Sequence, residues 1–376
     1  MTDVRLQIEK IELREIELPL KWPFETSFGR TTHRRILIVR AFDKSGAFGY
    51  GECTAPEDPF YNHETVDTAA LIIAKYVAPF LANANVERAA DVASSLDRIR
   101  GNRMAKGSVE TAIWDLQARL IGAPLWKLIG GARTEIPCGV SIGLQPSIDA
   151  LLDKVSREVE SGYQRIKIKI KPGQDVGLVE AVRRKFPSIL LTVDANSAYT
   201  LDDIEVIKQL DAYNLMMIEQ PLMSGDLVDH AKLQAQISTP ICLDESILTL
   251  TDARQAVELG SCRIINVKLG RVGGHSEANL IQAFSASHEI PVWCGGMLES
   301  GVGRAHNIAM STLPGFTLPG DVSASARYWE EDIIDPPVTV SPQGTIQAPS
   351  GPGIGYEVNE QRLESLVVRR QEIELR

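Results

Sequence analysis

Short runs of branched apolar residues recur about every 25 residues from residue 135 onward, and this period constrains the fold more than any other feature. Stretches with helical spacing, such as 176–185 and 250–259, separate most of the runs, and capping residues such as Thr200 and Thr249 often open them. Each run is typical of a buried strand, and each interval leaves room for the helical crossover that parallel strands need. The runs are 138–142, 165–170, 189–193, 215–218, 240–243, 264–267, 291–294 and, more weakly, 316–318.

Seven or eight β/α units of this size are what a (β/α)₈ barrel requires, and a doubly wound parallel sheet is the competing fold. Residues 1–130 follow a different pattern, because two alternating segments at 10–20 and 35–42 precede helical spacing from 63 to 128. Beyond Tyr328 the chain is rich in Pro and Gly and ends in a charged segment too short to fold alone. We therefore expect an α+β domain at 1–130, a barrel domain at 131–327, and a C-terminal segment at 328–376 that packs back on the first domain.

Charge and cysteine usage exclude several classes of function. Lys and Arg number 39 against 49 Asp and Glu, a formal net charge of −10, so neither nucleic acid nor an anionic membrane is an expected partner. The first residues are charged, and the longest apolar stretch, 69–84, is interrupted by Lys75 and Pro79, so neither secretion nor membrane spanning is expected. The five cysteines are scattered and form no C-x-x-C pair, which predicts buried thiols in a reducing cytoplasm.

Five ionisable residues occupy the same phase of the repeat, at the carboxyl ends of the expected strands, where barrels place their chemistry. Asp194, Glu219 and Asp244 are spaced 25 residues apart, Lys169 lies 25 residues before Asp194, and Lys268 lies 24 residues after Asp244. A single acidic residue after a strand is commonly a turn former or a helix cap, but three in register would repel one another strongly. A divalent cation held by hard oxygen ligands is the simplest compensation, and Mg²⁺ is the leading candidate.

The lysines indicate what such a metal site would do. In residues 165–171 the isoleucines share one face, so Lys167, Lys169 and Lys171 share the other. On an edge strand the lysine face would be exposed to solvent, whereas in a barrel it points inward. Lys169 is then a candidate base, and Lys268 would approach a metal-bound substrate from the opposite side. A metal that binds a carboxylate stabilises the enediolate formed when the adjacent carbon loses its proton. The pattern therefore predicts proton abstraction α to a carboxylate.

These residues resemble the enolase superfamily, specifically its muconate-lactonizing subgroup, with Lys-x-Lys on the second strand, Asp, Glu and Asp on the next three, and Lys on the sixth. That resemblance implies an α/β fold in which a modified TIM barrel, (β/α)₇β, carries an α+β capping domain built from both termini. Shorter motifs look like the o-succinylbenzoate synthase / N-succinylamino acid racemase family. They are the segments 167–173, 194–196, 218–221, 243–246, 266–271, 295–303 and 318–325.

The family resemblance implies two reactions at one site: dehydration of a cyclohexadiene carboxylate to o-succinylbenzoate in menaquinone synthesis, and racemisation of N-succinylamino acids by two lysines. It implies Asp194, Glu219 and Asp244 as ligands of Mg²⁺, with Mn²⁺ or another divalent cation as substitutes, and Lys169 and Lys268 as the acid/base pair. The expected partner is a small-molecule carboxylate, and by analogy with such barrels we expect a homo-oligomer. The implied substrate contacts are Ser141, Lys167, Asn196 and the backbone around Gly296, Met297 and Leu298.

Two further features yield weaker hypotheses. Arg271 follows Lys268 by three residues, and we hypothesise that its charge helps to set the protonation of Lys268; the alternative is a surface arginine in a loop. Aromatic residues in two loops of the first domain are candidate lids over the barrel mouth, although those of the first loop could equally join the two domains. The lid candidates are Trp22, Phe24 and Phe28 in the first loop and Tyr61 in the second.

Other functions compete with this interpretation. A dipeptide epimerase or a cycloisomerase of the same subgroup is the main enzymatic alternative, and epimerases are expected to carry an acidic pair where this chain has 320–323, a segment that retains Asp321. A non-catalytic metal-binding barrel is the alternative from a different class. The glycine-rich segments 270–274 and 351–355 do not fit a nucleotide-binding motif, and no histidines have metal-ligand spacing.

Overall fold

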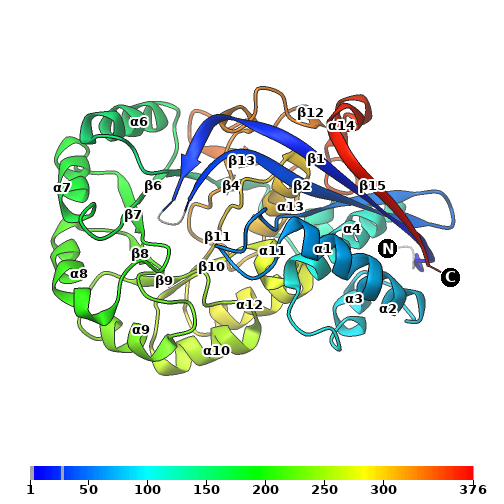
Figure 1. Cartoon of the computed structure of the whole chain (residues 1–376), viewed down its shortest axis with the longest axis horizontal. Coiled ribbons are helices and arrows are strands. Elements are labelled where there is room, and N and C mark those ends of the chain that lie inside the picture. Colours follow the sequence, from blue (N-terminus) through cyan, green and yellow to red (C-terminus); the bar gives the residue numbers. More distant parts are fainter. Residues whose placement is uncertain (1–3, 27–28, 376) are drawn as a thin grey trace.

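The computed structural model describes residues 4–26 and 29–375 and contains an antiparallel capping sheet and a parallel barrel sheet. The capping sheet has the order β15-β1-β2-β3, so the C-terminal strand adds to the edge of the N-terminal hairpin. Lys10 on β1 pairs with Glu374 on β15, and Figure 1 shows the two termini close together. The strands are β1 (Ile8–Glu25), β2 (Arg30–Asp43), β3 (Phe48–Cys53) and β15 (Val367–Glu374).

Helices cover one face of the capping sheet, and the longest of them, α4 (Arg103–Ile121), lies directly on β3. Glycines permit this approach, because a Cβ at Gly51 would sit 2.1 Å from the carbonyl oxygen of Ser108. The other elements of this layer are α1 (Val66–Ile72), the π-helical η1 (Ile73–Val77), α2 (Ala78–Ala82) and α3 (Ala90–Ser95). Helix α5 (Leu125–Leu128) contacts α4 and α13 (Gly301–Ser311) and contributes to the barrel core.

The barrel sheet consists of parallel strands in the order β5 to β11, each paired with its neighbour in the chain. Bridges from Phe316 to Val292 and from Gly320 to Cys138 link the segment 316–320 to both ends of this sheet, where the weak eighth run was expected. The strands are β5 (Gly139–Ile142), β6 (Arg165–Lys169), β7 (Leu190–Asp194), β8 (Met217–Glu219), β9 (Ile241–Leu243), β10 (Ile264–Val267) and β11 (Val292–Cys294).

Helices follow the barrel strands and most of them cover its outside, as the intervals between the apolar runs predict, whereas every residue of α13 is buried (Figure 1). The helices are α6 (Ile148–Glu160), α7 (Val176–Lys185), α8 (Ile204–Leu210), α9 (Leu227–Gln234), α10 (Leu250–Leu259), α11 (Leu269–Val272), α12 (His275–Ser287) and α13 (Gly301–Ser311), and the short 3₁₀ turns are η2 (Leu201–Asp203), η3 (Asp211–Tyr213) and η4 (Ser325–Arg327). The prediction of an α/β barrel with an α+β cap is confirmed, and the doubly wound alternative is wrong.

The C-terminal segment binds to both parts of the molecule through short pieces of sheet. Strand β13 (Thr345–Gln347) pairs with β4 (Glu135–Pro137) at the entry to the barrel, and β12 (Ile334–Asp335) pairs with β14 (Glu357–Val358). Helix α14 (Glu360–Leu366) then leads into β15. None of the described helices has the length and apolar composition needed to cross a membrane.

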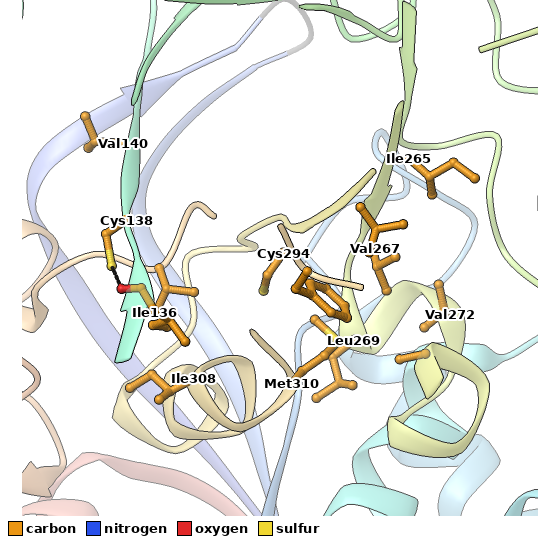
Figure 2. Close-up of a cluster of buried hydrophobic side chains, with 14 of the residues drawn as sticks. Ile136, Cys138, Val140, Ile265, Val267, Leu269, Val272, Cys294, Ile308 and Met310 are labelled. Atoms are coloured by element: carbon orange, nitrogen blue, oxygen red, sulfur yellow. Dashed lines mark hydrogen bonds between the residues drawn. The ribbon is translucent and has the colours of Figure 1, made fainter. Parts of the chain in front are cut away.

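A continuous apolar core joins the barrel strands to the helices around them (Figure 2). Val267 and Cys294, at the ends of β10 and β11, are buried in this core, as are Ile308 and Met310 of α13. Full burial of the Val, Ile and Met side chains contributes about 1.5–3 kcal/mol each. All five cysteines are buried free thiols.

Two buried histidines connect α12, α13 and β3. Nε2 of His306 donates to the carbonyl oxygen of Tyr50 at 2.7 Å, and Nδ1 of His306 is 3.0 Å from Nε2 of His275. With the proton of His306 on Nε2, its Nδ1 can accept from the Nε2–H of His275, and two neutral rings satisfy both of these hydrogen bonds. Burial lowers the pKa of both histidines, and His306 lowers that of His275 further.

This pair predicts a loss of stability in mild acid. The unfolded histidines take up protons as the pH falls below about 6.5, whereas the folded ones resist protonation. Lowering the pH from 7.5 to 5.5 therefore favours unfolding by about 1 kcal/mol per histidine. We expect the fall in the thermal midpoint between these two pH values to be smaller in His275→Gln than in the unsubstituted protein, measured by circular dichroism. An equal fall in both proteins would contradict this assignment.

Candidate active site

The order of the barrel strands places the two candidate catalytic lysines on either side of the three carboxylates. Asp194 and Glu219 are the last residues of β7 and β8, and Asp244 follows β9 directly. Lys169 ends β6, on one side of these strands, and Lys268 follows β10, on the other. All five side chains are buried. The structure thus brings together, at one end of the barrel, the five residues that the repeat singled out.

Each of the three carboxylates pairs with a lysine. Nζ of Lys169 is 2.5 Å from Oδ2 of Asp194, and Nζ of Lys268 is 2.7 Å from Oδ2 of Asp244. Nζ of Lys167 bridges Glu219 and Asp194, at 2.8 Å and 3.4 Å. Buried charges of opposite sign thereby offset part of the cost of their desolvation.

The pairing sets the pKa values of these groups. Burial and the neighbouring Asp194 raise the pKa of Glu219 to about 7. Burial also opposes the ionisation of Asp244, but Lys268 and Arg271 outweigh it and hold the pKa of Asp244 well below its ordinary value. Conversely, burial opposes the charge of Lys268, but Asp244 keeps the pKa of that lysine well above its ordinary value. Lys268 is thus held as a cation.

The donor set fits a divalent cation by its chemistry. Within residues 4–26 and 29–375, no three His, Cys, Asp or Glu side chains are close enough together to hold a metal ion, and the three carboxylates pair with lysines instead. However, Asp194, Glu219 and Asp244 offer buried carboxylate oxygens on neighbouring strands, and Oε2 of the adjacent Glu245 is buried with no hydrogen-bond partner in the described part of the chain. Such hard oxygens are the ligands that Mg²⁺ and similar cations prefer.

Backbone strain concentrates at this end of the barrel. Asn196, Ser197, Gln220 and Leu298 adopt φ values of 44°, 62°, 37° and 58°, the left-handed region that non-glycine residues rarely occupy. Gln220 directly follows β8, and the other three lie in the loops that follow β7 and β11. Residues held in such conformations cluster at functional sites, because the surrounding structure must enforce them.

Three of the residues implied as substrate contacts, Ser141, Lys167 and Asn196, lie beside Lys169 and the carboxylates, whereas Met297 packs against the core of the capping domain. Ser141 is aligned with Lys167 in the sheet register, so both face into the barrel, and Oγ of Ser141 is buried without a partner among the described residues. Asn196 accepts a hydrogen bond from Nζ of Lys169 at 2.7 Å. Met297 lies in the loop 295–300, which begins where β11 ends next to β10.

Asp321, Trp293 and Asn266 hold Lys167 and Glu219 in place inside the barrel. The sequence alone did not assign this role to them. Asp321 accepts from Nζ of Lys167 at 2.8 Å and from Arg165 at 2.6 Å, and Lys167 also lies 4.7 Å from the ring centre of Trp293. Asn266 donates to Oε1 of Glu219 at 2.8 Å. Asn266 precedes Lys268 by two residues, and side chains two residues apart on a strand share a face. The sequence therefore indicated that Asn266 points into the barrel with Lys268.

Arg271 and Tyr61 meet at Asp244. Arg271 lies in α11 with 1% of its surface exposed, so the alternative of a surface arginine is wrong. Its guanidinium donates to Oδ1 of Asp244, while the Tyr61 hydroxyl donates to the same oxygen at 3.1 Å. Nζ of Lys268 lies 4.6 Å from the centre of the Tyr61 ring. Tyr61 therefore reaches from the capping domain to the lysine.

The other aromatic loop lies on the β1–β2 hairpin, whose end extends over the barrel (Figure 1). The hairpin touches the loop after β5 through its backbone, where the amide of Leu144 donates to the carbonyl oxygen of Glu25 at 2.9 Å. Trp22 is 66% exposed, so it does not join the two domains by packing. Phe24 is partly buried on β1, and Phe28 lies outside the described residues.

Gln220 positions Asp244 and supplies a prediction. Its buried side-chain oxygen accepts from the backbone amide of Asp244 at 2.9 Å, and its Nε2 donates to Oγ of Ser246 at 2.8 Å. Gln220→Leu keeps the volume but removes both bonds, so we expect about 10- to 100-fold weaker activation by divalent metal. Titration of activity with Mg²⁺ would measure this effect, and an unchanged titration curve would contradict it.

Comparisons with known proteins agree with the geometry. Residues 9–130 match the family model for the mandelate racemase / muconate lactonizing enzyme N-terminal domain, and residues 150–362 match the enolase C-terminal domain-like model. The chain is 50% identical over 359 residues to an o-succinylbenzoate synthase of Geobacillus kaustophilus, covering 96% of each chain, and 49% identical over 353 residues to an N-succinylamino acid racemase of Thermus thermophilus, covering 94% and 95%. A solved structure of an enolase superfamily member from Listeria innocua superimposes with a TM-score of 0.95 at 44% identity, covering 99% of this chain and 100% of that one.

Proposed function

The chain belongs to the mandelate racemase / muconate lactonizing enzyme family of the enolase superfamily, and we propose that it removes the proton α to the carboxylate of a small-molecule substrate. Its relatives include enzymes named o-succinylbenzoate synthase and N-succinylamino acid racemase. We assign both reactions to this chain as candidates: dehydration to o-succinylbenzoate and racemisation of N-succinylamino acids. Enzymes of this superfamily generally use a divalent metal, and we propose Mg²⁺, with Mn²⁺ as a substitute.

The observation that carries the proposal is the placement of Lys169 and Lys268 on opposite sides of three buried carboxylates. A divalent cation bound by Asp194, Glu219 and Asp244 would stabilise negative charge that develops on the substrate carboxylate. Lys169 takes the α-proton from one face, and Lys268 delivers a proton to the other face, which inverts the carbon. In the dehydration, Lys169 moves the proton and the cationic Lys268 stabilises the anion.

The substrate contacts follow from the same arrangement. Ser141 offers an unused buried hydroxyl, and Lys167 and Asn196 face the interior beside Lys169. The backbone of Gly296, Met297 and Leu298 would contact the rest of the substrate, with Tyr61 and the hairpin residues Trp22 and Phe24 above it as lids.

Parallel assays test the proposal. The purified protein would be supplied with the cyclohexadiene precursor of o-succinylbenzoate, with N-succinyl-L-phenylalanine, and with a dipeptide such as L-Ala-L-Glu. We expect turnover of at least one of the first two, its loss in EDTA and its return with Mg²⁺. Faster epimerisation of the dipeptide would instead support the epimerase alternative. Absence of turnover of any carboxylate, with metal present, would support a non-catalytic barrel.

Arg271 provides a prediction that separates the two reactions. Its charge at Asp244 adjusts the proton affinity of Lys268, which must exchange a proton in racemisation but only stabilise charge in dehydration. We expect Arg271→Ala to reduce racemisation about 10-fold or more and dehydration by less. Steady-state rates of the two reactions measure the ratio, and equal retention of both activities would refute this role.

We propose a cytoplasmic homo-oligomer whose partners are small carboxylates rather than nucleic acids or membranes. The five free buried thiols and the net charge of −10 support this environment and these partners. Light scattering coupled to size-exclusion chromatography measures the oligomeric state, and a monomer at micromolar concentration would contradict the proposal.

A further inference from the structure

A buried glutamate at the end of a capping-domain strand reaches the first turn of a barrel helix. Glu52 lies on β3, with 6% of its surface exposed. Its Oε1 accepts from the amide of Ser300 at 3.1 Å, and its Oε2 accepts from the amide of Gly303 at 2.9 Å and from the Ser300 hydroxyl. One carboxylate thus caps the N-terminus of α13 from another domain.

The remaining amides of this first turn are also satisfied. Asp332, in the C-terminal segment, accepts from the amide of Gly301 at 2.7 Å, and the Ser300 hydroxyl accepts from the amide of Val302 at 3.3 Å. The capping domain and the C-terminal segment therefore hold the start of α13 between them. Burial and the neighbouring Glu299 raise the pKa of Glu52 to about 8, while the hydrogen-bond donors at Ser300 and Gly303 oppose this rise.

The fixed turn ends a loop that belongs to the site. Residues 295–300 connect β11 to α13, and the amide of Gly295 donates to the carbonyl oxygen of Val267 at 3.1 Å, next to Lys268. Leu298, in the middle of the loop, has the left-handed φ of 58°. A strained loop of this kind keeps its conformation only if both of its ends are anchored.

The same strand end also supports the loop that carries Lys268. A Cβ at Gly270 would lie 2.2 Å from Oγ1 of Thr54, so Thr54, two residues after Glu52, packs directly against the segment after β10. The end of β3 and the residue that follows it therefore contact two neighbouring segments of the barrel mouth, the start of α13 and the start of α11.

We propose that Glu52 is a positioning residue that anchors the loop 295–300 from the capping domain and so sets the conformation in which this loop binds the substrate. The expected effect on substrate binding rests on the proposed function, whereas the expected effect on the loop conformation does not. Without the cap, the first turn of α13 loses three hydrogen bonds, and the strained backbone at Leu298 can relax.

Two substitutions at Glu52 and one matched control test the proposal. Glu52→Gln is isosteric but turns an NH₂ group toward an N–H donor, and Glu52→Ala removes the cap. Asp115→Asn is the control, because Asp115 is also buried in the capping domain and accepts from two backbone amides, those of Tyr50 at 2.8 Å and Ile354 at 2.6 Å. Among the described residues, Asp115 has no hydrogen bond to the loop 295–300.

The first readout is hydrogen exchange of the backbone amides in 295–303, followed by mass spectrometry. We expect exchange about 5- to 10-fold faster in Glu52→Gln than in the unsubstituted protein, and no change in this segment in Asp115→Asn. Unchanged exchange in Glu52→Gln, or equal acceleration in the control, would overturn the proposal. Hydrogen exchange tests the anchoring role of Glu52 even if the protein turns over none of the substrates above.

The second readout is kinetic, with N-succinyl-L-phenylalanine and Mg²⁺. We expect KM to rise about 10-fold in Glu52→Ala and less in Glu52→Gln, with a smaller change in kcat, whereas Asp115→Asn keeps the KM of the unsubstituted protein. A purely structural role would lower the thermal midpoint of all three variants without moving KM. If Glu52→Ala fails to fold, Glu52→Gln decides the question.

Discussion

Replacing Lys268 with alanine is expected to lower the rate of N-succinylamino acid racemisation by at least about 10³-fold, because one of two acid/base groups is lost. Lys169 remains, so the variant should still exchange the α-proton of one enantiomer with solvent. Lys169→Ala should show the converse preference, since the two lysines lie on opposite sides of the carboxylates. Dehydration should be abolished in Lys169→Ala and reduced in Lys268→Ala.

The fold should tolerate the loss of Lys268, because Asp244 keeps its contacts with Arg271 and Tyr61. Circular dichroism would verify folding, and proton NMR in D₂O with each enantiomer separately would measure exchange. If both single variants exchanged the same enantiomer, the lysines could not act on opposite faces, and the mechanism would be wrong.

Asp244→Asn should have the second largest effect and should act on activity and stability together. Asp244 pairs with Lys268 and Arg271, which are 7% and 1% exposed, so the substitution leaves two buried cations without their anion. Breaking a buried ion pair from one side costs about 3–5 kcal/mol. The loss of a metal ligand should also lower turnover by at least about 10³-fold, and added Mg²⁺ should not restore it.

A surface carboxylate provides the control for this substitution. Glu205 pairs with Lys208 at 3.0 Å on an exposed helix face, so Glu205→Gln should leave the thermal midpoint and turnover unchanged. Thermal unfolding followed by circular dichroism compares the two variants. An Asp244→Asn protein as stable as the unsubstituted one would contradict the buried ion-pair assignment.

The repeat predicted most of the barrel, because apolar runs that alternate with helical spacing are properties of the local sequence. The expected runs 165–170 and 264–267 correspond to β6 and β10. Lys169 is the last residue of β6 and Lys268 directly follows β10, so the positions of these strands determine the positions of both lysines. Strand β3 was not predicted, since Gly49 and Gly51 interrupt its apolar pattern. These glycines allow α4 to pack closely against β3, and only the structure shows this packing.

The supporting contacts of the site could not be read from the sequence for the same reason. Glu52 lies about 250 positions from the helix that it caps, and nothing local distinguishes it from a surface glutamate. Arg271 was equally ambiguous until its burial beside Asp244 was known. Lysine–carboxylate pairing likewise depends on which strands are neighbours, although the alternation in 165–171 correctly indicated that Lys167 and Lys169 face inward.

The central claim is that this site removes an α-proton with a metal and two lysines, and the most direct test is proton NMR of N-succinyl-L-phenylalanine in D₂O. The unsubstituted protein would be incubated with Mg²⁺ and, in parallel, with EDTA, and optical rotation would follow the configuration. We predict metal-dependent loss of the α-proton signal accompanied by racemisation. An α-proton signal that persists with Mg²⁺, or that disappears equally fast in EDTA, would contradict the account.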